Sequence, residues 1–128
     1  MKFVPDCARD IMLAVEALGP DKTMTIPRLA EMYPDYSEDV LNYHCLKLLE
    51  AGFVDGVTVD VARKTLPQVS KLYALSFEGH QALEDMRPTP VWKQATKAAE
   101  DLGSFSLHAL AEIAAGIVSA SISSNFNR

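Results

Sequence analysis

Signals that stop helices divide the first part of the chain into three short segments. They lie at residues 19–20 (Gly-Pro), 33–34 (Tyr-Pro) and 52 (Gly). Proline lacks the backbone donor that a helix interior needs, the residue before it avoids the α region, and glycine favours the left-handed geometry of helix ends. Thr25 and Ser37 carry hydroxyls suited to capping the second and third segments. The pattern predicts helices over residues 6–18, 26–32 and 37–51.

A hairpin is predicted directly after these helices. Residues 53–59 are rich in valine and are interrupted by Asp-Gly at 55–56, and residues 71–75 alternate like a returning strand. The order helix, short helix, longer helix, hairpin is typical of a winged helix-turn-helix. In that arrangement, residues 37–51 form the recognition helix and residues 60–70 form the tip of the wing.

Further helices are predicted in the rest of the chain. Ser76 caps one over residues 77–86, and prolines separate it from another over residues 91–102. The predicted fold class is mainly α with a small β-hairpin, a winged helix-turn-helix plus a C-terminal helical extension. The expected domains are the winged helix over residues 1–87 and the extension over residues 88–128.

The last predicted helix follows Ser106, its expected N-cap, and carries few charges. On its outward face only Glu112 is charged, and small residues such as Gly116 would let another helix approach closely. Two arrangements follow from this pattern. Either residues 106–122 form the seam of a homodimer, or the helix packs over the core of its own chain.

The composition of the 128 residues, 48% hydrophobic and 23% charged, indicates a globular protein with a substantial core. Its two cysteines, Cys7 and Cys45, are too few and too far apart for a disulfide scaffold. No secretion signal opens the chain, and no uncharged apolar run reaches the roughly 18 residues of a membrane span. We therefore expect a cytoplasmic protein with no membrane partner.

Patterns typical of catalysis and metal binding are missing from the sequence. His44 and Cys45 are adjacent, so on a helix their side chains diverge by about 100° and form a poor dyad. Because His44 lies between Val40 and Leu48 on the inward face, we expect a hydrogen-bonded core histidine. The chain has no paired Cys-x-x-Cys or His-x-x-x-His and no glycine-rich phosphate loop. We expect no enzymatic activity, no metal and no cofactor.

Charge is distributed unevenly along the chain. The formal net charge of −5 argues against indiscriminate binding of nucleic acid over the whole surface. Residues 61–71, however, contain Arg63, Lys64 and Lys71 and no acidic residue. On a wing, these three cations are suited to contacts with the phosphates of duplex DNA.

The outward face of the predicted recognition helix gives a mixed indication. Asn42, Tyr43 and Lys47 are expected to point outward, where they could reach base edges or the DNA backbone. Acidic residues such as Asp39 share this face and would repel phosphate. Binding of duplex DNA is the favoured function. The alternative is a protein-interaction module without DNA binding, using exposed side chains such as Tyr43 and Leu46.

The most specific motif of the chain begins with Leu-Ser-Phe-Glu-Gly-His at residues 75–80 and continues to Val-Trp at 91–92. Together with residues 43–53, it resembles the YjcQ-like family of prophage- and phage-encoded winged-helix proteins. That family has threonine and tryptophan where this chain has Ser76 and Phe77. The resemblance implies a small winged-helix protein of mobile-element origin, with an aromatic core residue at Phe77. It implies no substrate, because the family has no assigned activity.

The same motif has a structural explanation, which we favour over a ligand site. Ser76 can cap the helix, and Gly79 can let the start of that helix pass close to the hairpin. Leu83 and Trp92 are expected to fill the joint between the hairpin and the C-terminal helices. His80 can then hydrogen-bond to the backbone or to a carboxylate.

Overall fold

The computed structural model describes residues 1–102 and 107–126 of the 128-residue chain. The chain divides into two compact units, Met1–His80 and Gln81–Arg128. The boundary between them falls inside helix α4 (Phe77–Met86).

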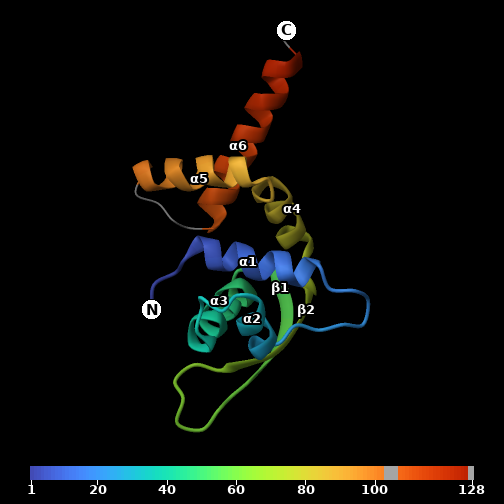
Figure 1. Cartoon of the computed structure of the whole chain (residues 1–128), viewed down its shortest axis with the longest axis vertical. Helices are drawn as coiled ribbons and strands as arrows, with labels where there is room; N and C mark the ends of the chain where they lie inside the picture. The colour runs from blue at the N-terminus through green and yellow to red at the C-terminus, as the bar shows by residue number, and fades with distance from the viewer. Residues whose placement is uncertain (103–106, 127–128) are drawn as a thin grey trace. The chain divides into compact units, whose positions relative to one another are not determined.

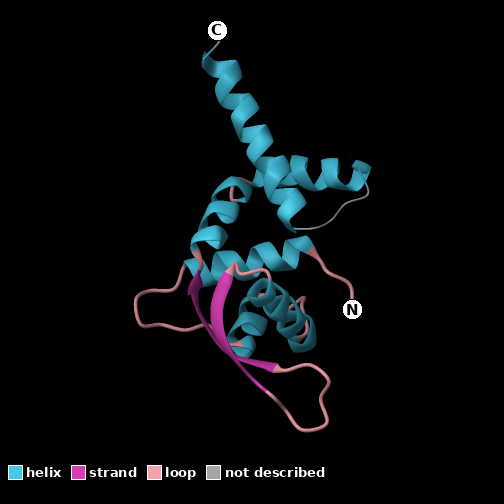
Figure 2. Cartoon of the chain, turned by 180° about the vertical axis from the view of Figure 1, so that it is seen from behind, coloured by secondary structure: helices cyan, strands magenta, loops and turns pink. Residues whose placement is uncertain are grey.

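The N-terminal unit has the predicted order of helix, short helix, longer helix and antiparallel hairpin (Figures 1 and 2). Figure 1 shows α1 lying across the other two helices and the hairpin. The loop over residues 60–67, here called the wing loop, extends away from the helices of this unit. The elements are α1 (Pro5–Glu16), α2 (Ile26–Met32), α3 (Glu38–Glu50), β1 (Val54–Val59) and β2 (Gln68–Leu75).

Local capping determines where these helices begin and end. The Oγ1 of Thr25 accepts a hydrogen bond from the backbone N–H of Arg28 (3.4 Å), and the Oγ of Ser37 accepts one from the N–H of Val40 (3.2 Å). Gly52 follows α3 with a φ of 77°, the left-handed geometry that glycine adopts without strain. The predicted caps and the predicted stop are confirmed.

β2 is longer than its partner because the pairing contains two irregularities. β1 has 6 residues and β2 has 8. Each register shift leaves one residue of β2 without a direct partner, Tyr73 in one case and Ser70 in the other, as in β-bulges. The simple alternation predicted for the returning strand was therefore wrong. Buried side chains recur at every third position of β2, at Val69, Leu72 and Leu75.

A short backbone pairing ties the α1–α2 connection to the hairpin. The N–H of Met24 donates to the carbonyl oxygen of Leu72 (2.9 Å), and the N–H of Leu72 donates to that of Met24 (2.8 Å). Both side chains are buried. β2 thus pairs with β1 along one edge and with Met24 along the other.

The core of the N-terminal unit is built from the inward faces of its helices and from β2. Cys7 and Cys45 are free thiols within it and are fully buried. Burial is the main cause that raises the pKa of each thiol to about 12. The large side chains that are fully buried here are Ile11, Met12, Met24, Ile26, Leu29, Leu41, Leu48 and Leu72.

Two tyrosines attach the turn between α2 and α3 to the first helix. The hydroxyl of Tyr36 donates to Oδ2 of Asp10 (3.0 Å), and the hydroxyl of Tyr33 donates to the backbone oxygen of the same residue (3.2 Å). Burial raises the pKa of the Asp10 carboxyl and of both phenols. This turn is therefore held by side chains as well as by its backbone.

The start of α4 is fitted closely against the segment between α3 and β1. The Oγ of Ser76 accepts from the N–H of Gly79 (3.0 Å), so the predicted cap is confirmed. The N–H of Ser76 donates to the carbonyl oxygen of Phe53 (2.9 Å). A Cβ on Gly79 would lie only 2.0 Å from that same oxygen, which confirms the expected close approach. The expectation for Phe77 was wrong: its side chain is 73% exposed at the first position of the helix.

The C-terminal unit contains the rest of α4, α5 (Thr89–Leu102) and α6 (Leu107–Phe126). α5 begins two residues before the predicted start, because Pro90 fits the first turn of a helix. Leu83 and Trp92 are buried, as are Leu110 and Ala114 in the first half of α6. The predicted cap at Ser106 lies outside the described residues.

Candidate nucleic-acid interface

The exposed surface of α3 carries one cation, Lys47, which forms an ion pair with Glu50. Nζ of Lys47 lies 3.1 Å from Oε2 of Glu50 and 5.5 Å from the centre of the Tyr43 ring. The hydrogen bond to Glu50 is the main cause that raises the pKa of Lys47. Tyr43 and Lys47 are both partly exposed, as expected. The positive charge that this face could offer to phosphate is therefore partly balanced within the helix.

The first turn of α3 carries two exposed acidic residues, Glu38 and Asp39. Negative charge at this position is favourable for the helix, because the first turn presents unpaired N–H groups and the positive end of the helix dipole. The same charge would repel a phosphate backbone. The start of α3 is thus built for helix stability rather than for contact with nucleic acid.

Asn42 does not lie on the outward face where it was predicted. Its side chain is only 8% exposed. The amide Nδ2 donates to the carbonyl oxygen of Pro67 (3.1 Å), and Oδ1 accepts from the N–H of Val69 (2.8 Å). The outward assignment was wrong because the end of the wing loop folds back over this part of α3. Asn42 is therefore unavailable to a base edge in this arrangement.

The wing loop and the adjoining strand present the other three candidate cations, Arg63, Lys64 and Lys71, all exposed. The N–H of Lys64 donates to the carbonyl oxygen of Val61 (3.1 Å) and closes a four-residue turn. Arg63 is the third residue of this turn and has a φ of 65°. Turns with a left-handed third residue normally have glycine there, so the arginine is held in a strained backbone at the tip.

The third cation, Lys71, lies over an aromatic ring. Nζ of Lys71 lies 5.5 Å from the centre of the Tyr73 ring. Tyr73 is one of the two bulge residues of β2 and is 41% exposed. It was not among the predicted candidates, although its position two residues after Lys71 places both side chains on one face of a strand.

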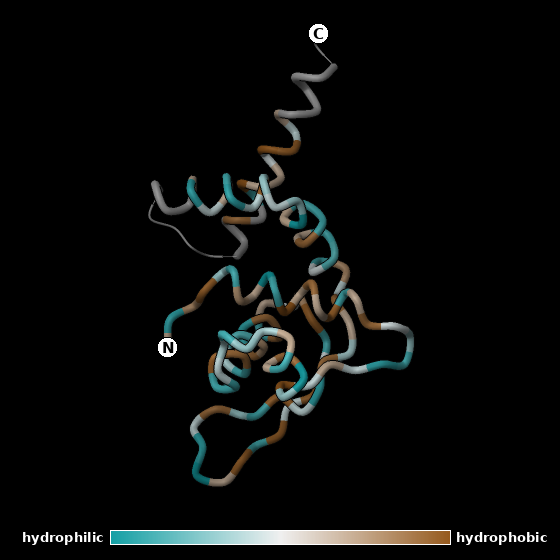
Figure 3. Tube along the Cα trace, in the orientation of Figure 1, coloured by the Kyte–Doolittle hydropathy of each residue, from teal (hydrophilic) through white to brown (hydrophobic). Residues whose placement is uncertain are grey.

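The hairpin also exposes several apolar side chains, which the sequence analysis did not single out. Brown, apolar stretches are visible along the wing loop in Figure 3. A valine at every second position from 57 to 61 was the available signal, since the strand reaches past the core that would cover one face. The exposed apolar residues of the hairpin are Val57, Val59, Val61, Leu66 and Tyr73.

His44 is a core histidine, as expected, and both ring nitrogens are used. Nε2 accepts from the backbone N–H of Val4 (2.8 Å), which requires the proton on Nδ1, and Nδ1 lies 2.7 Å from the carbonyl oxygen of Val40. The ring is fully buried and stacks on Phe3, with ring centres 5.3 Å apart. Burial is the main cause that lowers the pKa of His44. This geometry stabilises the fold and leaves no free nitrogen for a ligand or a proton transfer.

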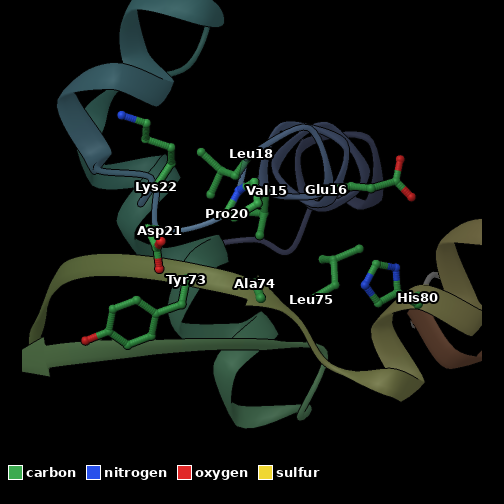
Figure 4. A pocket seen from close by; sticks show the side chains of 11 residues that line it. Val15, Glu16, Leu18, Pro20, Asp21, Lys22, Tyr73, Ala74, Leu75 and His80 are labelled. Atoms are coloured by element: carbon green, nitrogen blue, oxygen red, sulfur yellow. The ribbon is translucent and has the colours of Figure 1, made fainter.

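A cavity of about 430 Å³ lies elsewhere in the N-terminal unit, at the end of α1 (Figure 4). Val15 and Leu75 are among its apolar lining, and Asp21, Lys22 and His80 are among its polar residues. His80 is exposed there. The lining lacks serine and cysteine, so the cavity holds no nucleophile–base pair of that kind.

The described part of the chain contains neither a metal-ligand cluster nor a helix suited to span a membrane. Among residues 1–102 and 107–126, no cluster of three or more histidine, cysteine, aspartate or glutamate residues is placed to hold a metal ion. No helix in these ranges is both long enough and apolar enough to cross a membrane.

Comparison with protein families adds one finding. The family model described as "Hypothetical protein (DUF2513)" matches residues 2–106. The chain belongs to the DUF2513 family. The description of DUF2513 names no activity, and the matched range includes both the α3 surface and the hairpin. Neither a curated protein nor a solved structure matched the chain.

Proposed function

We propose that this protein is a cytoplasmic winged-helix module that binds duplex DNA, with the wing loop and β2 making the main contacts. The observation that carries the proposal is the group of three exposed cations, Arg63, Lys64 and Lys71, in a segment without acidic residues. The order of elements and the extended loop between paired strands support a wing. Contacts of this kind position a protein on DNA through its phosphates.

The α3 surface plays the smaller part in this proposal. Tyr43 and Lys47 remain as candidate contacts, whereas Asn42 is withdrawn because its amide is bonded to the wing base. Glu38 and Asp39 would keep the start of α3 away from the phosphate backbone. We therefore expect binding led by the hairpin, with a strong dependence on salt and a weak dependence on base sequence.

Fluorescence anisotropy with a mixed-sequence duplex tests this proposal. Three phosphate contacts give a log–log salt slope of about −2.7, so affinity should fall about 40-fold between roughly 50 and 200 mM salt. Arg63→Gly and Lys64→Ala should each flatten the slope by about 0.9. Lys22→Ala removes an equal charge at an exposed position outside the hairpin and serves as the matched control. Absence of binding at the lower salt concentration would refute the proposal.

The second candidate is a protein-interaction module that does not bind DNA. The exposed apolar residues of the hairpin favour it, because phosphate contacts make no use of a side chain such as Val59 or Leu66. Such a module would not bind the duplex at low salt. Its complex with a protein partner would be weakened by Leu66→Asn, which leaves the charge of the wing unchanged, and kept by Arg63→Gly, the opposite of the outcome for DNA.

Two further features belong to the same proposal. The resemblance of residues 75–93 to YjcQ-like proteins supports a role in prophage or phage regulation. The small residues of α6 support a homodimer through residues 106–122, of which Gly116 has no atom within 4 Å of an added Cβ. Light scattering that gives the mass of one chain at all concentrations would contradict the dimer.

A further inference from the structure

Asn42 makes a pair of hydrogen bonds that is unusual for a helix side chain. One planar amide donates to the carbonyl oxygen of Pro67 and accepts from the N–H of Val69, at 3.1 and 2.8 Å. These two backbone groups are two residues apart on one extended segment. That is the spacing at which a residue of a neighbouring β-strand would accept and donate. The side chain of Asn42 thus takes the place of one residue of a strand.

The position of this contact matters because it lies at the base of the wing loop. Val59 and Gln68 form the last pair between β1 and β2, and the loop beyond them has no partner strand. Pro67 ends that loop, and it offers only a carbonyl because proline has no N–H. The amide of Asn42 therefore reaches the point where the loop joins β2.

We infer that Asn42 is a positioning residue that fixes the wing against α3. Its amide belongs to the middle of α3, and its two partners belong to the base of the loop that carries Arg63 and Lys64. The cations of the wing and the surface of α3 are held by it in one arrangement. The inference about position stands on this geometry, and its effect on duplex binding rests on the proposed function.

The contact of Asn42 with Pro67 and Val69, here called the joint, restricts what can replace the asparagine. The position needs one donor and one acceptor in a short planar group that is almost fully buried. A neutral carboxylic acid offers both, whereas an ionised carboxylate only accepts and would face the Pro67 carbonyl oxygen with negative charge. Leucine has nearly the same size and offers neither. Asn42→Asp should therefore keep the joint only when the introduced carboxyl is protonated, and Asn42→Leu should lose it at every pH.

A distance measurement between spin labels tests the joint without DNA. Labels are placed at the wing tip by Ala62→Cys and at the end of α3 by Glu50→Cys, both at exposed positions. The native thiols are buried, so the labels report these two sites alone. Double electron–electron resonance should give a narrow distribution of the distance between the two labels when Asn42 is present, at pH 7.5 and at pH 5. Asn42→Leu should give a broad one at both values.

Asn42→Asp supplies the decisive comparison, because the same chain is measured with the introduced carboxyl ionised and with it protonated. Burial and the facing carbonyl oxygen of Pro67 should raise the pKa of the introduced carboxyl well above the value of about 3.9 that is usual for aspartate. The distance distribution of this variant should therefore be broad at pH 7.5 and narrow at pH 5. The parent chain and Asn42→Leu at both pH values control for protonation of His44, and Gln94→Glu controls for an added negative charge at an exposed site. A variant that was merely destabilised would not narrow on acidification. Equal distributions in all variants, or broadening that ignores pH, would overturn the inference.

Duplex binding measured on the same variants separates the two proposals. If the wing binds phosphate, Asn42→Asp should lower affinity about tenfold at pH 7.5 and recover it at pH 5, the size expected for losing one hydrogen bond to a buried group. If the distances behave as expected and no variant binds the duplex, the joint stands and the DNA proposal fails. If the duplex binds equally to all variants, the DNA proposal stands and the expected effect of Asn42 on duplex binding is refuted.

Discussion

Replacing Gly79 by alanine tests the contact between α4 and Phe53, which lies between α3 and β1. In most helix interiors this change is stabilising, because alanine has the higher helix propensity by about 1 kcal/mol. Here the added Cβ would lie 2.0 Å from the carbonyl oxygen of Phe53 and 3.0 Å from its carbon. The obstacle is backbone rather than the end of a flexible side chain, so α4 must move away by about 1 Å or more to reach ordinary contact distances.

The magnitude follows from what that movement breaks. The N–H of Ser76 bonds to the same Phe53 oxygen at 2.9 Å, and the Ser76 hydroxyl caps the helix through the N–H of Gly79 at 3.0 Å. One backbone hydrogen bond and one cap contribute about 1 kcal/mol each. Residual crowding costs about 1–3 kcal/mol, and the gain in propensity offsets about 1. We expect Gly79→Ala to lower the free energy of unfolding by about 2–4 kcal/mol.

Urea denaturation followed by circular dichroism measures this change. Gly116→Ala in α6 is the matched control, because nothing lies within 4 Å of a Cβ added there. That variant should be more stable than the parent chain by about 0.5–1 kcal/mol. Two glycine-to-alanine changes in helices of one protein are thus expected to act in opposite directions. If Gly79→Ala were as stable as Gly116→Ala, the close packing at Phe53 would be refuted.

Three other predictions follow from buried or strained groups. Because burial lowers the pKa of His44, the unfolded chain binds a proton at this histidine before the folded chain does as the pH falls. The urea midpoint should therefore fall as the pH drops below about 6.5. A midpoint that stays constant from pH 7.5 to 5 would contradict this. Asp10, whose pKa is raised, acts in the opposite direction at lower pH. Arg63→Gly should raise stability by about 1 kcal/mol because it relieves a left-handed backbone, and a loss of stability would count against the turn. Cys7 and Cys45, with pKa values near 12, should resist a thiol reagent at pH 8 until urea unfolds the chain; rapid native labelling of either would disprove their burial.

Most of the fold could be predicted from signals that lie within a few residues of each other in the sequence. Thr25 and Ser37 cap because a hydroxyl lies three residues before an unpaired N–H, and Gly52 ends α3 because it tolerates a positive φ. Each of these features is settled by the residue and its nearest neighbours in sequence. Gly79 was also singled out, but the atom that excludes a side chain there belongs to Phe53, which is distant in sequence.

The features that sequence reasoning missed depend on contacts between distant segments. Asn42 lies beside partly exposed neighbours on α3 and is covered only because Pro67 and Val69, more than 20 residues away, fold back onto it. The bridge between Met24 and Leu72 joins segments that are still farther apart in sequence. Hydrophobic periodicity within one helix or strand does not indicate a contact partner that is distant in sequence.

The candidate site was predicted unevenly for a related reason. Arg63, Lys64 and Lys71 lie on an extended hairpin, where charge alone predicts exposure, and all three are exposed. Tyr73 lies two residues after Lys71, so ordinary alternation places it on the same face, and it was overlooked. The bulge at Tyr73 has no obvious mark in the sequence, and it brings Leu75 to the buried side. Phe77 was placed in the core by resemblance, whereas the first position of α4 turns its side chain outward.

The two-sided pairing of β2 has a consequence for how the chain is made. β2 is the last element of the sheet to leave the ribosome, and it is the only one that meets both β1 and Met24. Until residue 75 has emerged, the exposed valines of β1 have no hydrogen-bonded neighbour, and the connection after α1 is untethered. A nascent chain that ends inside the wing loop therefore presents an open strand edge, the state in which β-rich segments associate with each other. Synthesis through this stretch therefore passes through a state with an unpaired strand edge.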